Sequence, residues 1–235
     1  MVVQMNIRWE HKPSSLTVIR TIKSYIAHPK KSFRLDQKMW GDYFSYKKCI
    51  KNGLANYYDE LPKHANPPEF YDLYQLYSLV RNRKPEIVME LGGGNSTIAL
   101  SYALKRNCEE GQGTGKLYSI DESEHWQGAL KDYMPDELTS FCEFLVRPVS
   151  LRLDSKGEHV KCFEDLPQLP VNLLYIDGGG IAEGVEFETL APSDFLIVID
   201  GRGPICKYLK ENLSKKYRFE ENIIHSQRIF ELVNL

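Results

Sequence analysis

Residues 85–100, PEIVMELGGGNSTIAL, constrain the fold more than any other part of the chain. The apolar run at 87–89 predicts a buried strand, which ends at Glu90 and the triplet Gly92, Gly93 and Gly94. Residues 95–97, Asn-Ser-Thr, then open a segment with the apolar spacing of a helix. A strand, a glycine turn and a helix N-terminus together present backbone N–H groups and the positive helix end to a ligand.

Several classes of ligand bind at such a turn, and the residues around the turn distinguish one class from another. A dinucleotide site of the form G-x-G-x-x-G needs glycine at the sixth position, where this chain has Thr97. A phosphate-binding P-loop needs a lysine, and the turn has none. An acidic residue followed by G-x-G is the arrangement of enzymes that use S-adenosylmethionine (SAM), where a carboxylate can answer the ligand's amino group. A glycine turn that binds nothing is the remaining alternative.

Composition narrows the class of protein. A chain of 235 residues can hold one domain of ordinary size plus an appendage. No apolar run approaches the roughly 20 residues of a membrane span, and the amino terminus lacks the basic start and apolar stretch of a secretory signal. The five cysteines are scattered and show no C-x-x-C spacing, which favours reduced thiols. We therefore expect a cytoplasmic protein that has no membrane partner.

Apolar strands alternate with helical segments along the rest of the chain. Further strands are predicted at residues 116–120, 141–146, 171–176 and 195–199. The runs 217–224 and 227–232 are separated by His225-Ser226, which is hairpin spacing. This pattern predicts an α/β fold: a Rossmann-like, doubly wound, seven-stranded sheet, mostly parallel with an antiparallel C-terminal hairpin.

The N-terminal segment differs in character from the remainder. Residues 1–84 carry 15 Lys and Arg against 7 Asp and Glu, whereas residues 85–235 carry 15 against 25. Amphipathic helices are predicted at 16–27 and 69–81. We expect an N-terminal helical appendage, residues 1–84, and a ligand-binding domain, residues 85–235. The basic charge indicates either an anionic substrate or docking on the acidic domain, and the appendage is expected to act as a lid, a docking element or a dimer contact.

Together these features resemble the class I SAM-dependent methyltransferase family over residues 85–235. The sequence from Glu90 to Gly94 is similar to the family's first motif. Asp121 ends the second strand, where the family holds the ribose hydroxyls of SAM. The sequences ELGGGNSTIAL and LLYIDGGG are most similar to those of the small-molecule O-methyltransferase branch, whose members carry acidic residues after the fourth and fifth strands. In this chain those residues are Asp177 and Asp200.

The resemblance implies a set of site residues. The expected cofactor-binding residues are Glu90, Gly92, Gly93, Gly94, Asn95, Ser96, Asp121, Glu122, Val149, Ser150 and Asp177, and the expected catalytic residues are Asp177 and Asp200. Val149 and Ser150 stand where the family contacts the adenine edge. The structural alternatives are that Asp121 only caps the following helix and that Asp177 only caps its glycine turn.

A metal ion is not expected. In metal-dependent O-methyltransferases the two aspartates help to hold Mg²⁺ with an Asn or Asp beside the second, and here that neighbour is Gly201. If a divalent ion were bound, Asp177 and Asp200 would be its ligands. His159 and His225 are expected to be surface residues.

The resemblance implies a SAM-dependent methyltransferase acting on a small-molecule acceptor, at oxygen. The alternatives are an RNA methyltransferase and a SAM-binding partner subunit without catalysis. Against nucleic acid, the fourth strand lacks the Asp/Asn-Pro-Pro-Tyr/Phe sequence of adenine methyltransferases, and the chain has no Pro-Cys nucleophile.

Overall fold

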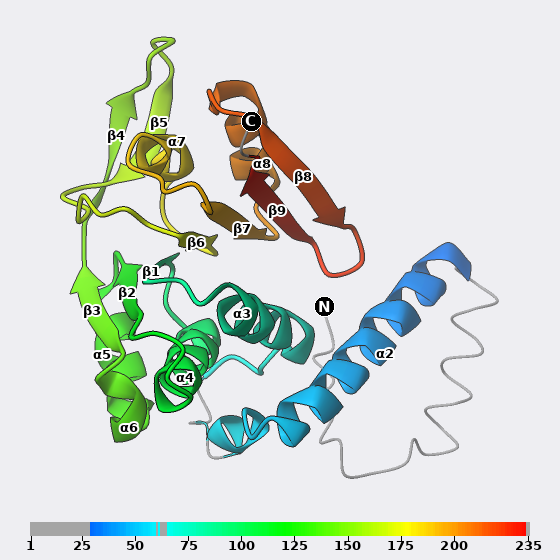
Figure 1. Ribbon diagram of the computed structural model, residues 1–235. Helices are drawn as coiled ribbons and strands as arrows, with labels where there is room; N and C mark the ends of the chain where they lie inside the picture. Colours follow the sequence, from blue (N-terminus) through cyan, green and yellow to red (C-terminus); the bar gives the residue numbers. More distant parts are fainter. Residues whose placement is uncertain (1–28, 60, 62–64, 234–235) are drawn as a thin grey trace. The chain divides into compact units, whose positions relative to one another are not determined.

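The computed structural model describes residues 29–59, 61 and 65–233 (Figure 1). The chain divides into two compact units, Met1–Gly41 and Asp42–Leu235, and helix α2 (Pro29–Lys51) contains the boundary. The helix predicted at 16–27 lies outside the described residues. In the part that is described, no helix has both the length and the apolar content to cross a membrane. In the described part of the chain, all strands belong to the second unit.

A seven-stranded sheet organises this unit, with strand order β3-β2-β1-β6-β7-β9-β8. The parallel strands are β1 (Ile87–Leu91), β2 (Lys116–Asp121), β3 (Cys142–Val146), β6 (Leu173–Ile176) and β7 (Leu196–Asp200). The antiparallel hairpin is β8 (Tyr217–Asn222) and β9 (Gln227–Leu232), and β9 pairs with β7. The predicted fold class is confirmed.

Both faces of the sheet are buried, which is why its central strands read as continuous apolar runs. Along the strands, side chains alternate between two core clusters. Val88, Leu173 and Val198 belong to the cluster on one face. Met89 and Ile197 belong to the cluster on the other.

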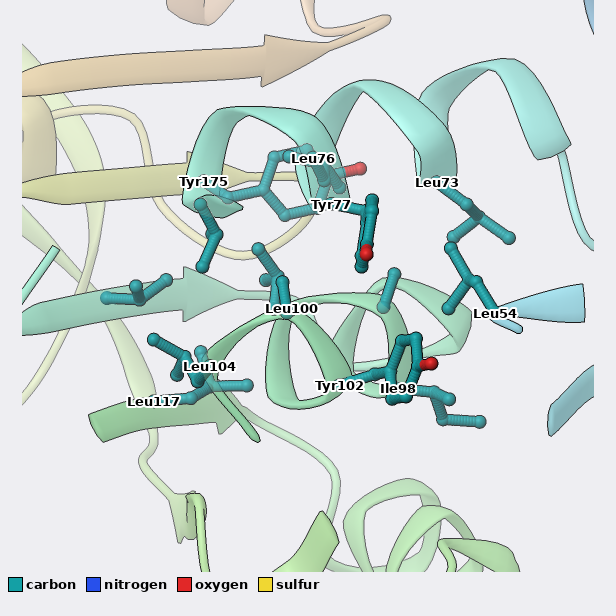
Figure 2. Close-up of a cluster of buried hydrophobic side chains, with 14 of the residues drawn as sticks. Leu54, Leu73, Leu76, Tyr77, Ile98, Leu100, Tyr102, Leu104, Leu117 and Tyr175 are labelled. Atoms are coloured by element: carbon teal, nitrogen blue, oxygen red, sulfur yellow. The ribbon is translucent and has the colours of Figure 1, made fainter. Parts of the chain in front are cut away.

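Helices cover each face. On the first face lie the 3₁₀ turn η1 (Ala55–Tyr58), α3 (Phe70–Arg83) and α4 (Asn95–Glu109). Figure 2 shows side chains of α3, including Leu73, Leu76 and Tyr77, facing those of α4. The second face packs against α7 (Glu183–Glu188) and α8 (Gly203–Asn212).

The C-terminus of helix α3 also contacts β9 and the residues that precede β7. Arg83 pairs with Glu231 of β9 at 2.8 Å and donates to the backbone oxygen of Asp194 at 2.7 Å. Within the second unit, α3 therefore packs with the sheet. The predicted division into residues 1–84 and 85–235 stays a prediction.

Two further helices follow β2. Helix α5 (Glu124–Tyr133) begins after Ser123, whose hydroxyl accepts the Trp126 N–H at 3.1 Å and so caps the helix. The short α6 (Asp136–Thr139) leads into β3.

A second, two-stranded sheet was not predicted from the sequence. It consists of β4 (Val149–Leu153) and β5 (His159–Phe163), paired antiparallel. Val149 and Ser150 therefore begin a strand of this second sheet. The hairpin returns the chain to the sheet at Phe163, which is buried.

Phe163 lies against the second glycine triplet. Gly179 has a φ of +70°, and a Cβ at this position would stand 1.8 Å from a carbon of the Phe163 ring. Gly179 therefore needs glycine for two reasons, its left-handed backbone and the ring that covers it.

Gly179→Ala is expected to lower the free energy of unfolding by about 2–4 kcal/mol, from the left-handed backbone and the overpacked ring. Gly111→Ala is a matched control, because Gly111 has a φ of +67° but no atom within 4 Å of an added Cβ. It should lose about 1 kcal/mol, from the backbone alone. Urea unfolding of both variants measures the difference, and equal losses would show that the Phe163 contact costs nothing.

Candidate functional site

The glycine turn after β1 rests on a buried carboxylate. Glu90 is fully buried, and its Oε2 accepts the hydroxyls of Thr97 at 2.5 Å and Ser119 at 2.8 Å. Glu90 and Ser119 are direct partners in the β1–β2 register, and Thr97 comes from the first turn of α4. The Thr97 oxygen in turn accepts the Gly94 N–H at 3.0 Å. One carboxylate thus joins β1, β2, α4 and the turn itself.

Burial changes the chemistry of Glu90. Removal from water raises the pKa of Glu90 to about 7, and the hydroxyls of Ser96, Thr97 and Ser119 oppose that rise. The carboxyl group is therefore close to half protonated near neutral pH. It supports the turn from beneath and lines neither of the clefts described next.

Two adjoining clefts open at the carboxyl ends of the strands. The first, of about 320 Å³, is lined by Asn66, Pro67, Glu69, Asp72, Leu73, Leu76, Gly93, Gly94, Asn95, Ser96, Trp126, Tyr133, Tyr175, Asp177 and Asp200. The second, of about 410 Å³, is lined by Asn66, Gly92, Gly93, Asp121, Glu122, Trp126, Lys161, Phe163, Asp177, Gly178, Gly179 and Arg202. Asn66, Gly93, Trp126 and Asp177 are common to both.

The two glycine turns touch each other. Gly92 has a φ of +93°, and a Cβ there would stand 2.7 Å from the backbone nitrogen of Gly178. The Asp177 N–H donates to the Leu91 oxygen at 2.9 Å. Because neither turn carries a side chain at the contact, the ends of β1 and β6 approach each other closely. Residues of both turns also line the clefts.

Polar residues at the end of β2 face the second cleft. The Oδ1 of Asp121 accepts the Ser123 N–H at 2.8 Å, which leaves Oδ2 for another group. Glu122 lies 3.9 Å from the Lys161 ammonium of β5. Trp126 closes the turn from the other side, since its Nε1 donates to the Gly93 oxygen at 2.6 Å.

Asp177 stands between the clefts with Arg202 beside it. The Arg202 guanidinium lies 3.4 Å from Asp177 Oδ1 and also donates to the Asp177 backbone oxygen. Burial raises the pKa of Asp177, and Arg202 pulls it down. Asp200, at the end of β7, lines the first cleft with Asp177. The two predicted catalytic residues therefore share a cavity.

The structure does not bring every predicted residue to the clefts. Gly92, Gly93, Gly94, Asn95, Ser96, Asp121, Glu122, Asp177 and Asp200 line them. Glu90 lies beneath the turn, and Val149 and Ser150 lie in β4, outside the residues lining either cleft.

The sequence reasoning missed one wall of the first cleft. Asn66, Glu69 and Asp72 come from the approach to α3 and its first turn. A buried acid on an otherwise apolar helical stripe was the available signal: Asp72 is only 4% exposed.

His225 is buried, so the expectation of a surface residue was wrong. Its ring stacks on Tyr71 of α3, with centroids 3.5 Å apart and planes at 8°. Asn222 of β8 donates to the Tyr71 hydroxyl at 2.6 Å, and Gln227 of β9 donates to Asp72 at 3.4 Å. These contacts hold the C-terminal hairpin against the first turn of α3, beside the cleft.

Among the described residues, no group of three or more His, Cys, Asp or Glu side chains is arranged to hold a metal ion. Asp177 and Asp200 are followed by glycines, so no third carboxylate or amide stands next to them in the chain.

Comparison with known proteins gives a fold but no sequence relative. No protein-family model matches the chain, and no curated protein matches it. Among solved structures, the SAH-bound methyltransferase of Podospora anserina superimposes with a TM-score of 0.50 at 11% identity, covering 88% of this chain and 97% of that one. A methyltransferase from Geobacter sulfurreducens gives 0.47 at 11% identity over 82% and 87% of the two chains.

Strand order, C-terminal hairpin and the Podospora anserina comparison agree. The fold is the Rossmann-like fold of that methyltransferase. In this fold the clefts occupy the position that open α/β sheets use for ligands, outside the carboxyl ends of the strands where the chain reverses direction across the sheet.

Glu90→Gln is expected to flatten the pH dependence of stability. An acid whose pKa rises on folding is favoured protonated in the folded state, so its contribution is lost as pH rises from about 4.5 to about 7. That loss is on the order of 3 kcal/mol for Glu90. Urea unfolding at pH 5 and pH 8 should show a smaller difference in the variant than in the wild type.

Glu183 provides the matched comparison, because burial raises the pKa of this second fully buried acid to about 7 as well. Glu183→Gln should remove a similar share of the pH dependence, and the double variant most of it. Parallel curves for wild type and Glu90→Gln would contradict this account of Glu90.

Proposed function

We propose that the protein is a SAM-dependent methyltransferase that transfers a methyl group to a small-molecule acceptor, at oxygen. One observation carries the proposal: the glycine turn between β1 and α4 lines both clefts, and it shares the second with Asp121 of β2, in the fold of a solved methyltransferase. The Podospora anserina protein of that fold is SAH-bound, and SAH is the demethylated product of SAM.

The clefts fit such a cofactor. Gly94 lines the first cleft, and a Cβ there would meet no atom within 4 Å, so the approach to the main chain is open. Asp121 has an oxygen available for a vicinal diol. The Asn95 Oδ1 is buried and accepts no hydrogen bond from any described residue, although it lies in the cleft lining. A ligand donor would satisfy it.

These residues divide the cofactor between them. Asp121 and Glu122 would hold the ribose in the second cleft. The backbone N–H groups at the N-terminus of α4, at Asn95 and Ser96, would face the carboxylate of the methionine portion, because these groups and the helix dipole favour an anion. The Asn95 Oδ1 would accept a hydrogen bond from the amino group of the same portion. Bound there, SAM supplies a methyl group already activated by its sulfonium.

For its part, the protein must position an acceptor and take its proton. Asp177 is suited to accept the proton of a hydroxyl, because its raised pKa makes the carboxylate a stronger base than an exposed aspartate. Arg202 holds that carboxylate in place. Asp200 lies in the same cleft and would orient the acceptor hydroxyl. Alignment of acceptor and methyl group would provide much of the remaining acceleration.

The cleft lining supports a small acceptor over a nucleic acid. Cavities of about 320 and 410 Å³ are of the size that takes small ligands. Glu69, Asp72 and Asp200 line the first of them, and carboxylates repel the phosphate backbone that dominates nucleic-acid binding.

Calorimetry should show that the purified chain binds SAM and SAH but not NAD. Thr97 is the reason for the selectivity, because it fills the position that a dinucleotide fingerprint reserves for glycine and bonds to Glu90. Binding of NAD without SAM would exclude the proposed function.

Asp121→Ala should weaken SAM binding by about 1–3 kcal/mol, the cost of leaving ligand hydroxyls unpaired. Asp132→Ala is the matched control, since Asp132 is an exposed acid of α5 that lines neither cleft. Titration calorimetry compares the two. Equal SAM affinity in wild type and Asp121→Ala would show that Asp121 accepts the Ser123 N–H but does not bind the ribose.

A further inference from the structure

Glu183, the first residue of α7, is fully buried and lines neither cleft. Its Oε1 accepts the backbone N–H of Phe163 at 2.8 Å. Its Oε2 is buried and has no hydrogen-bond partner among the described residues. A buried carboxyl group with an unsatisfied oxygen lowers stability, and an apolar side chain of similar size would avoid that loss. The presence of an acid here therefore points to a role other than stability.

The Glu183 carboxyl group lies directly against the second glycine triplet. A Cβ at Gly180 would stand 1.8 Å from Glu183 Oε1 and 2.5 Å from its Oε2. The end of the Glu183 side chain can rotate, whereas the backbone at Gly180 is part of the turn after β6. A methyl group at position 180 would therefore push the carboxyl group away from the Phe163 N–H.

Three contacts join strand β5 to the turn after β6. The Ile181 N–H donates to the Lys161 oxygen at 2.7 Å, and Glu183 accepts the Phe163 N–H two residues further along β5. The Phe163 ring lies against Gly179. Strand β4 pairs with β5 along its whole length. The Glu183 carboxyl group thus accepts an N–H of β5 that a further strand would otherwise have to satisfy.

Both partners in this junction line the second cleft. Lys161 and Phe163 come from β5, Gly178 and Gly179 come from the turn, and Asp121 lines the same cleft. Strand β5 belongs to the two-stranded sheet and has no partner in the seven-stranded one. Its position beside the end of β6 therefore depends on contacts such as the three above.

A further contact of the β4–β5 hairpin is more exposed. Arg152 of β4 pairs with Glu186 of α7 at 2.9 Å, and both side chains are more than a third exposed. Exposed ion pairs of this kind contribute little. The Glu183–Phe163 hydrogen bond is shielded from water and lies next to the cleft, so it is better suited to hold β5 in place.

We propose, on the basis of the proposed function, that Glu183 is a positioning residue for the cofactor. It touches no ligand itself. Through the Phe163 N–H, its carboxyl group holds β5 at the second glycine turn and so fixes the wall of the second cleft, where the ribose of SAM would bind beside Asp121. Without that bond β5 can shift from the turn, and the cleft no longer fits the nucleoside portion of the cofactor.

Three variants test the bond in different ways. Glu183→Met removes the acceptor and keeps an unbranched side chain of similar length. Gly180→Ala keeps Glu183 but displaces its carboxyl group. Glu183→Gln retains an oxygen that can accept the Phe163 N–H, so it should rescue binding. Gly184→Ala is the matched control, because a Cβ there would stand 2.8 Å from a Leu209 side-chain carbon and lines neither cleft.

Titration calorimetry with SAH and with adenosine measures the effect in each variant, at a temperature where thermal unfolding shows that all are folded. Glu183→Met and Gly180→Ala should lower the affinity for SAH about 10-fold, and that for adenosine by the same factor, because adenosine carries only the nucleoside portion. Glu183→Gln and Gly184→Ala should stay within about 3-fold of the wild type.

The outcomes separate the two proposals. If the wild type binds SAH and both Glu183→Met and Gly180→Ala bind it equally well, the positioning role is overturned and the proposed function stands. A loss of SAH affinity that spares adenosine, or a Glu183→Gln variant as weak as Glu183→Met, also overturns the positioning role. If Glu183→Met does not fold, Gly180→Ala against Gly184→Ala decides. A wild-type protein that does not bind SAH overturns both proposals.

Discussion

The site depends on the buried carboxylate of Glu90. A fully buried acid is costly unless hydrogen bonds satisfy it, and here Thr97 of α4 and Ser119 of β2 supply two to its Oε2. The bonds are structural in effect: they hold the N-terminus of α4 at a fixed position over the end of β1. Thr97 completes the arrangement by accepting the Gly94 N–H. The residue that breaks the dinucleotide fingerprint is thus the one that fastens this turn, and a glycine in its place would lose both bonds.

Close packing against this turn positions other residues that line the clefts. Gly92 lies against Gly178, so the end of β6 is brought beside the end of β1. The chain runs from β1 outward through β2 and β3, then returns to β6 on the other side of β1. Open α/β sheets bind ligands at this reversal, because helices leave the strand ends in opposite directions and a crevice remains between them. Asp121 and Asp177 flank it.

How much of this the sequence could reveal depended on periodicity and side-chain direction. The parallel strands were predictable because burial on both faces makes them continuous apolar runs, and Gly92 to Gly94 marked the turn. The β4–β5 hairpin was not, since its strands are short and Leu151 and Leu153 point outward. Glu90 was expected to meet the ligand because it adjoins the glycines. The alternation of β1 instead directs it inward toward Ser119, which a motif cannot show.

The wall of the first cleft that Glu69 and Asp72 form at the start of α3 is held by other contacts than the glycine turn. Residues of the glycine turn are fixed by backbone contacts and by Glu90. Asp72 belongs to α3, which the stack of Tyr71 on His225 holds against the C-terminal hairpin. Arg83 and Glu231 pin the other end of that helix. These contacts involve neither the turn nor Asp121, but α3 also packs against α4, whose first turn carries Asn95 and Ser96. A substitution along α3 can therefore reach both the wall of the first cleft and the glycine turn.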